Sequence, residues 1–138
     1  MSNRMAILAK IAVSDIFRAK DAAGPVRICL TIRVTETTIL ARAVTTQDLI
    51  EFDRRTGTSE HKAWGEIYNY VIDSVARLPE DIHEIMLSLD RKYRDSEYKF
   101  AENPDWEPTP EESRLTKEQI RGLLFVADFY PAHPLPRD

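Results

Sequence analysis

The chain has 138 residues, of which 43% are hydrophobic, and its formal net charge is −4 at pH 7. This length suits one compact domain, and we expect residues 1–138 to form one. The acidic balance argues against a general nucleic-acid binder, which is normally basic over its binding domain. No apolar run reaches the ~20 residues of a membrane span, so no membrane partner is expected. The single cysteine, Cys29, and the lack of a signal-peptide pattern favour a cytoplasmic location.

Residues 1–44 predict a small antiparallel sheet of about three strands. Residues 5–17 fit either a strand or a helix, and a strand is favoured because a turn-like KDAAGP segment follows. Residues 26–34 alternate between apolar and other side chains, which is typical of a half-buried strand. Residues 38–44 form the third expected strand after a polar turn.

Residues 45–130 predict three to four helices, which makes the fold class α+β with the sheet packed against these helices. A short helix is expected at residues 45–57, longer helices at 59–78 and 79–100, and a last helix at 116–130. The helix at 59–78 is expected to anchor the core through a stripe that starts at Trp64, with Ser59 as its N-cap. Residues 101–114 form a proline-rich loop, and residues 131–138 an extended tail.

Catalytic and metal-binding motifs are lacking in the sequence. His61, His83 and His133 show no spacing typical of a helical metal site, and Cys29 has no cysteine partner. We therefore predict no catalytic residue, no metal and no cofactor. Absence of a motif is weak evidence, because a site assembled from distant segments leaves no local signature.

Three arginines form the first candidate surface. The alternation of the strands places Arg27, Arg33 and Arg42 on one exposed face of the sheet. Such a face can hold phosphates or a carboxylate-rich partner. The alternative is a solvated face whose charges discourage strand pairing. An RNA-binding sheet would need exposed aromatic residues among the arginines, and none alternates with them.

The acidic loop and the last helix form the second candidate surface. Trp106 and Glu107 lie in the loop, where a tryptophan is either a contact point or a cover for the core. Phe125 and Phe129 add a second apolar side to the last helix. A helix that is apolar on two sides is either central or covered by a partner.

These surfaces favour a protein that binds another protein, such as an inhibitor, an immunity-type partner or an accessory factor without catalysis, and a homodimer is a further option. One alternative is a small enzyme acting on an anionic substrate, with the arginine face and either His61 or His83. A second alternative is a nucleic-acid binder that uses the same arginines. A histidine beside a buried carboxylate would favour the enzyme, and an exposed apolar patch near Trp106 or the last helix would favour the protein binder.

Overall fold

The computed structural model describes residues 3–128 and 133–136, and the chain divides into two compact units. One unit consists of Met1–Leu78 with Tyr130–Asp138, and the other of Pro79–Phe129. The expectation that residues 1–138 form a single domain stays a prediction.

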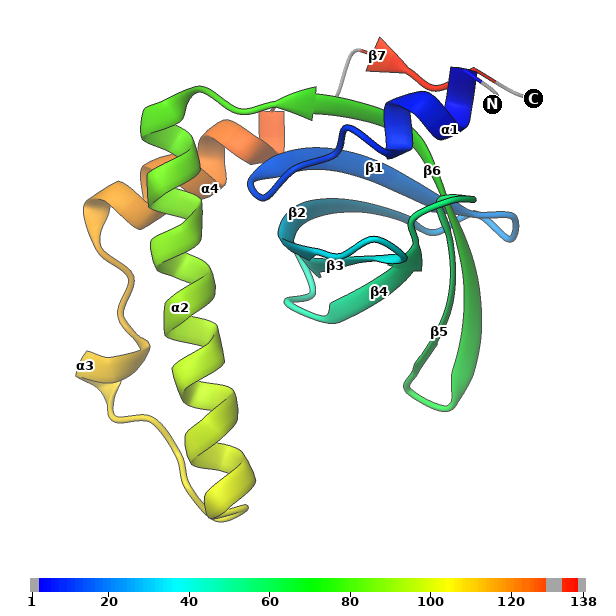
Figure 1. Ribbon diagram of the computed structural model, residues 1–138. Coiled ribbons are helices and arrows are strands. Elements are labelled where there is room, and N and C mark those ends of the chain that lie inside the picture. Colours follow the sequence, from blue (N-terminus) through cyan, green and yellow to red (C-terminus); the bar gives the residue numbers. More distant parts are fainter. Residues whose placement is uncertain (1–2, 129–132, 137–138) are drawn as a thin grey trace. The chain divides into compact units, whose positions relative to one another are not determined.

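The first unit is an antiparallel sheet that curls into a nearly closed barrel (Figure 1). The strands are β1 (Asp15–Asp21), β2 (Val26–Val34), β3 (Thr38–Ala43), β4 (Leu49–Asp53), β5 (Thr58–Ala63), β6 (Glu66–Arg77) and β7 (His133–Pro134). Their order is β4-β3-β2-β1-β6-β5, and β7 pairs with β6. The expected small sheet of about three strands is therefore wrong, although the protein is α+β.

The largest correction concerns residues 59–78, which form the hairpin β5–β6 and not a helix. The turn consists of Trp64 and Gly65, whose φ angles are 50° and 77°. Positive φ at both central residues is typical of a type I′ turn, whose twist matches that of the flanking strands. Tyr70 and Ile72 are buried while Val71 between them is exposed, and this period of two is that of a strand. Trp64 is 72% exposed and is not a core residue.

Two other segments also differ from expectation. Within residues 5–17, neither single element is correct, because α1 (Asn3–Leu8) precedes the start of β1 at Asp15. The short helix expected at residues 45–57 is replaced by β4, in which Ile50 and Phe52 are buried and their neighbours exposed. β4 and β5 face each other across the barrel seam, where the Ser59 hydroxyl donates a hydrogen bond of 2.6 Å to the Glu51 carbonyl.

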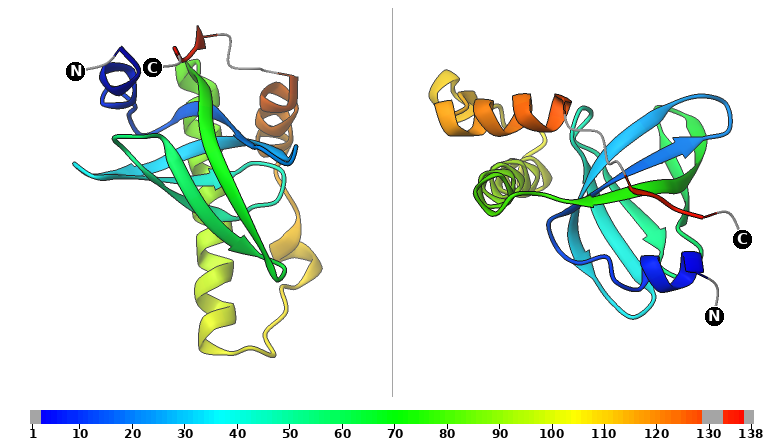
Figure 2. Two further views of the ribbon diagram at one scale, coloured as in Figure 1. Left: turned by 90° about the vertical axis from the view of Figure 1, so that its right-hand side faces the viewer. Right: turned by 90° about the horizontal axis from the view of Figure 1, so that it is seen from above.

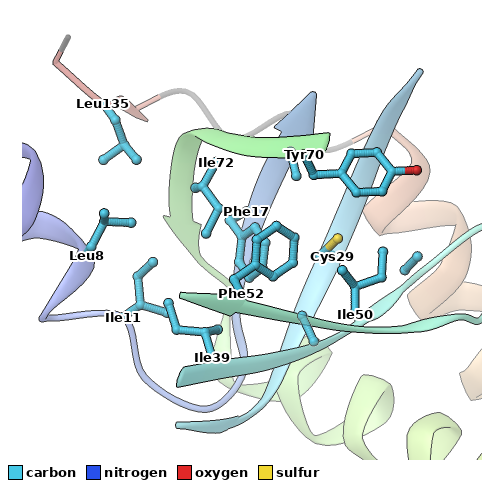
Figure 3. Close-up of a cluster of buried hydrophobic side chains, with 13 residues drawn as sticks. Leu8, Ile11, Phe17, Cys29, Ile39, Ile50, Phe52, Tyr70, Ile72 and Leu135 are labelled. Carbon is cyan, nitrogen blue, oxygen red and sulfur yellow. The ribbon is translucent and has the colours of Figure 1, made fainter. Parts of the chain in front are cut away.

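The barrel interior holds the main hydrophobic core (Figure 3). Phe17 and Phe52 meet edge to face at its centre, with ring centroids 5.1 Å apart. Leu8 from α1 and Ile11 from the segment after it are also buried in this cluster.

The second unit contains α2 (Glu80–Glu102), α3 (Pro110–Ser113) and α4 (Lys117–Asp128). The two long helices confirm the helical predictions for residues 79–100 and 116–130 as far as the described residues extend. α2 and α4 lie side by side (Figure 2). Gly122 permits their close approach, since a Cβ built there would lie 2.6 Å from Cγ2 of Ile85. The predicted capping box before α4 is present, with Thr116 and Gln119 exchanging two hydrogen bonds.

Candidate functional site

The two ends of the barrel differ in character. In an antiparallel meander, successive turns lie at alternate ends, so the turns at residues 22–25, 44–48 and 64–65 share one end. The opposite end, here called the α1 end, holds the turns at 35–37 and 54–57. There the Arg54 guanidinium donates hydrogen bonds to the carbonyls of Thr35, Ala9 and Ile11. This arginine ties α1 and two turns together, and it serves the fold.

The other end gathers ionisable and hydroxyl side chains, and we call it the polar end. Residues two apart on a strand share a face. Arg27 therefore lies on the interior face of β2, the same face as the buried Cys29 and Thr31. Tyr68 precedes the buried Tyr70 and Ile72 on the interior face of β6. His61 lies opposite Tyr68 in the register of β5 and β6. With Asp48, which precedes β4, these residues form the polar cluster: Arg27, Asp48, His61, Tyr68 and Tyr70.

Three of these side chains form an aromatic wall on the hairpin β5–β6. The rings of Tyr68 and Tyr70 are stacked, with centroids 5.8 Å apart and planes within 14°. The His61 imidazole lies 6.3 Å from the Tyr70 ring. In Figure 3 the Tyr70 hydroxyl points away from Leu8 and Ile11, which are the core residues of the α1 end.

The polar groups of the cluster differ in how far they are paired. Tyr70 is only 1% exposed as a residue, but its hydroxyl oxygen is not one of the buried atoms that lack a hydrogen bond. Burial raises the pKa of this hydroxyl, and the charge of Arg27 acts in the opposite direction. The His61 Nε2 atom is buried without a hydrogen bond, 3.8 Å from Oδ2 of Asp48. Arg27 donates to the carbonyl of Val26 alone, at 3.1 Å, so most of its donors are available.

Neighbouring carboxylates are instead committed to the fold. The two carboxylate oxygens of Asp21 accept from the backbone amides of Ala23 and Asn69. Glu66 accepts a hydrogen bond of 2.9 Å from the Tyr68 hydroxyl, and this bond raises the pKa of Tyr68. The remaining groups can do two things: Arg27 and Tyr70 can donate to an anion, and His61 beside Asp48 can hold or move a proton.

Cys29 lies beside this cluster but offers no reactive thiolate. Its side chain is fully buried in the barrel, and burial raises the pKa of the thiol to about 12. The thiol is therefore protonated at neutral pH and is not a ready nucleophile.

The expected arginine face is not formed, which corrects the sequence analysis. The register of β2 against β3 shifts between Thr31 and Arg33. Arg33 then pairs with Leu40, two residues from Arg42 on the outer face of β3, whereas Arg27 faces the interior. Arg42 is only 4% exposed and holds the Gln47 carbonyl at 2.7 Å. Arg33 alone is exposed.

The residues predicted on the acidic loop and the last helix lie in the second unit. Trp106 is half-buried, with Nζ of Lys99 5.5 Å from its ring centroid. Lys99 also forms an ion pair of 3.0 Å with Glu112. Glu107 is exposed, Phe125 is partly exposed, and Phe129 lies outside the described residues. His83 is half-buried on α2 and far along the chain from the polar cluster.

A separate concavity of about 540 Å³ opens at the α1 end. It is lined by Met5, Ala9, Glu36, Thr37, Asp53, Arg54 and Arg55. Its central arginine, Arg54, is engaged by backbone carbonyls, and Asp53 accepts from the amides of Arg55 and Thr56. We therefore place the candidate site at the polar end, where Arg27 lies near the aromatic wall and His61 lies beside Asp48.

Within residues 3–128 and 133–136, no group of three or more His, Cys, Asp or Glu is arranged to hold a metal ion. No helix in that part of the chain combines the length and apolar character needed to cross a membrane. Comparison of the chain with protein-family models, curated proteins and solved structures gives no match.

Proposed function

We propose that the polar cluster binds a small molecule through an anionic group, either a carboxylate or a phosphate. The observation that carries the proposal is that the Arg27 guanidinium, whose one hydrogen bond among the described residues goes to the Val26 carbonyl, shares the polar end of the barrel with the Tyr68 and Tyr70 hydroxyls. An anion bound there would accept hydrogen bonds from the charged guanidinium and from the Tyr70 hydroxyl. The single buried cysteine suits a reducing compartment, so a cytoplasmic location is part of the proposal.

A small anion fits this end better than a nucleic acid does. Binding of a polyanion requires several cations along one face, and Arg33 and Arg42 lie on the other face of the sheet from Arg27. The carboxylates of Asp21, Asp48 and Glu66 lie at the same end and repel any anion, but they repel a long phosphate backbone more than one anionic group. One cation suits a single anionic group.

The Asp48–His61 pair links this proposal to the small-enzyme alternative raised by the sequence. A histidine beside a buried carboxylate is the arrangement that would favour that alternative; Nε2 of His61 lies 3.8 Å from Oδ2 of Asp48, and this carboxylate is only partly buried. The pair supplies a group that can accept or return a proton on a bound ligand. Ligand binding is the part of this function that the arrangement of donors supports directly.

The test compares two arginines of the same strand. Amide chemical shifts are followed by NMR while sodium acetate or sodium phosphate is titrated into the wild type, Arg27→Ala and Arg33→Ala. We expect Arg27→Ala to weaken binding by roughly tenfold or more, because a hydrogen bond to a charged group is worth about 1.5–3 kcal/mol. Arg33→Ala should bind like the wild type.

Circular dichroism of each variant checks that the fold is retained. Shift changes in the wild type should centre on Tyr68, Tyr70 and His61. Equal weakening in the two variants, or changes confined to other parts of the barrel, would reject the polar end as the anion site.

A second candidate function, binding of another protein, is favoured by the surface of α4. Ile120 and Leu124 are 46% and 63% exposed on this helix, one turn apart. Adjacent exposed apolar residues are characteristic of interaction surfaces. The partner would be another protein, which the sequence favours, or a second copy of the chain, which the sequence leaves as an option.

A further inference from the structure

We infer that the ligand of the polar cluster is an aromatic anion, in which a flat ring and a carboxylate or phosphate belong to one small molecule. This inference rests on the proposed anion site and adds the chemical class of the ligand. It follows from the aromatic wall beside Arg27.

The wall ends in a ring that can accept a further ring. Tyr70 is buried, and Tyr68 stacks on it toward the polar end with its side chain only partly buried. The next interior position along β6 is the exposed Glu66, whose carboxylate accepts the Tyr68 hydroxyl. No further aromatic residue of β6 therefore continues the stack within the strand. A planar ligand ring on Tyr68 would extend it in the offset geometry that aromatic pairs prefer.

The anion-binding donor lies near the same rings. The charge of Arg27 acts on the hydroxyls of both Tyr68 and Tyr70. Between β2 and β6 lies β1, which presents Ala19 opposite Arg27 on one side and opposite Ile72 on the other. Ala19 is small and leaves space beside Arg27, and the β1 residue opposite Tyr70 is Asp21, whose two carboxylate oxygens are held by the amides of Ala23 and Asn69. One compact molecule can then meet both.

His61 supplies a polar edge to this arrangement. It lies directly opposite Tyr68 across the hairpin, and its Nε2 atom is buried without a hydrogen bond among the described residues. Aliphatic anions of the same charge would meet Arg27 and leave the wall without a partner.

The test compares ligands of equal charge and similar size that differ in aromaticity. Benzoate and cyclohexanecarboxylate form one pair, and phenyl phosphate and cyclohexyl phosphate form the other. Dissociation constants are measured by NMR titration for the wild type, Tyr68→Phe, Tyr68→Leu and Arg27→Ala. We expect the aromatic member of at least one pair to bind the wild type roughly 2- to 12-fold more tightly, the range that one stacked aromatic pair provides.

The variants separate the ring from the hydroxyl. The preference should persist in Tyr68→Phe, which keeps the ring, and disappear in Tyr68→Leu, which keeps an apolar side chain. Arg27→Ala should weaken all four ligands. If Tyr68→Leu does not fold, the aromatic preference of the wild type and of Tyr68→Phe decides the question.

The outcomes distinguish this inference from the proposed function. Equal binding of aromatic and saturated ligands, still dependent on Arg27, would overturn the aromatic ligand and leave the anion site standing. Failure of all four ligands to bind at the polar end would overturn both. A preference in one pair alone supports the inference and identifies the anion as carboxylate or phosphate.

Discussion

Trp64 has two features that do not serve folding. Its φ angle of 50° lies in the left-handed region, where a bulky side chain is a rare outlier. Its side chain is 72% exposed at the tip of the hairpin β5–β6. Asn-Gly is the favoured pair for a type I′ turn, so the tryptophan occupies the position that asparagine would suit better.

Replacement of Trp64 should therefore leave the fold intact. We expect Trp64→Ala to change the free energy of unfolding by less than about 0.5 kcal/mol, as for most surface substitutions, and Trp64→Asn to raise it. The control is Phe52→Ala, which removes a buried ring and should cost about 3–5 kcal/mol. Urea denaturation measures all three variants, and a loss for Trp64→Ala as large as that for Phe52→Ala would restore Trp64 as a core residue.

At the scale of elements, the turn between β4 and β5 depends on the Asp53 carboxylate. Hydrogen bonds from the amides of Thr56 and Arg55 hold the pKa of this carboxyl below its usual value. Because the pKa is lower in the folded state than in the unfolded state, the charged carboxylate stabilises the fold at pH values above the unfolded pKa of about 3.9. This contribution is lost as the pH falls through the folded pKa.

We expect Asp53→Ala to lower the melting temperature at pH 7 and to approach the wild type below about pH 4, near the usual pKa of aspartate. Thermal melts over this pH range measure the difference. Asp95→Ala is the control, since the Asp95 side chain is exposed on α2 and its carboxylate makes no hydrogen bond to a described residue. A difference between the wild type and Asp53→Ala that stays constant with pH would contradict this role for the carboxylate.

At the scale of the whole molecule, the exposed face of α4 provides the test of a protein partner. We expect Leu124→Glu to abolish a protein interaction that the wild-type chain makes. The interaction is measured as co-purification of a partner protein from the native cell, or as self-association of the chain in sedimentation. Burying the glutamate charge in the contact with a partner costs free energy, which weakens binding. Leu124 is exposed in the chain alone, so the substitution should leave folding unaffected.

The matched control for this experiment is Glu118→Lys, which changes the charge of an exposed residue on the same helix. At about 100° per residue, Glu118 lies roughly 160° around the helix from Ile120 and roughly 120° from Leu124, so this change falls away from the apolar pair. Equal binding by the wild type and both variants would remove α4 as an interaction surface. Unfolding of Leu124→Glu would instead mean that this residue is part of the core.

The sequence alone determined the elements whose signals are local. α2 and α4 follow from apolar stripes at steps of three and four and from a capping box within the segment. β2 and β3 follow from alternation over six or more residues. Residues 64–78 satisfy both periods, because Tyr68, Val71 and Val75 fit a helical stripe while Tyr70 and Ile72 alternate with exposed neighbours. Local pattern could not decide between them.

Only the tertiary structure decided the barrel and the candidate site. Closure depends on β1 pairing with β6, whose paired residues are 49 to 62 positions apart in the chain (Asp21 with Tyr70, Asp15 with Arg77), and a one-residue shift of register moves a side chain to the other face. The register shift between Thr31 and Arg33 places Arg27 and Arg33 on opposite faces of the sheet, so the expected arginine face is not formed. The sequence drew attention to Arg27 and His61 individually. Their approach to Asp48, Tyr68 and Tyr70 arises from four segments brought together by strand pairing, which no local spacing encodes.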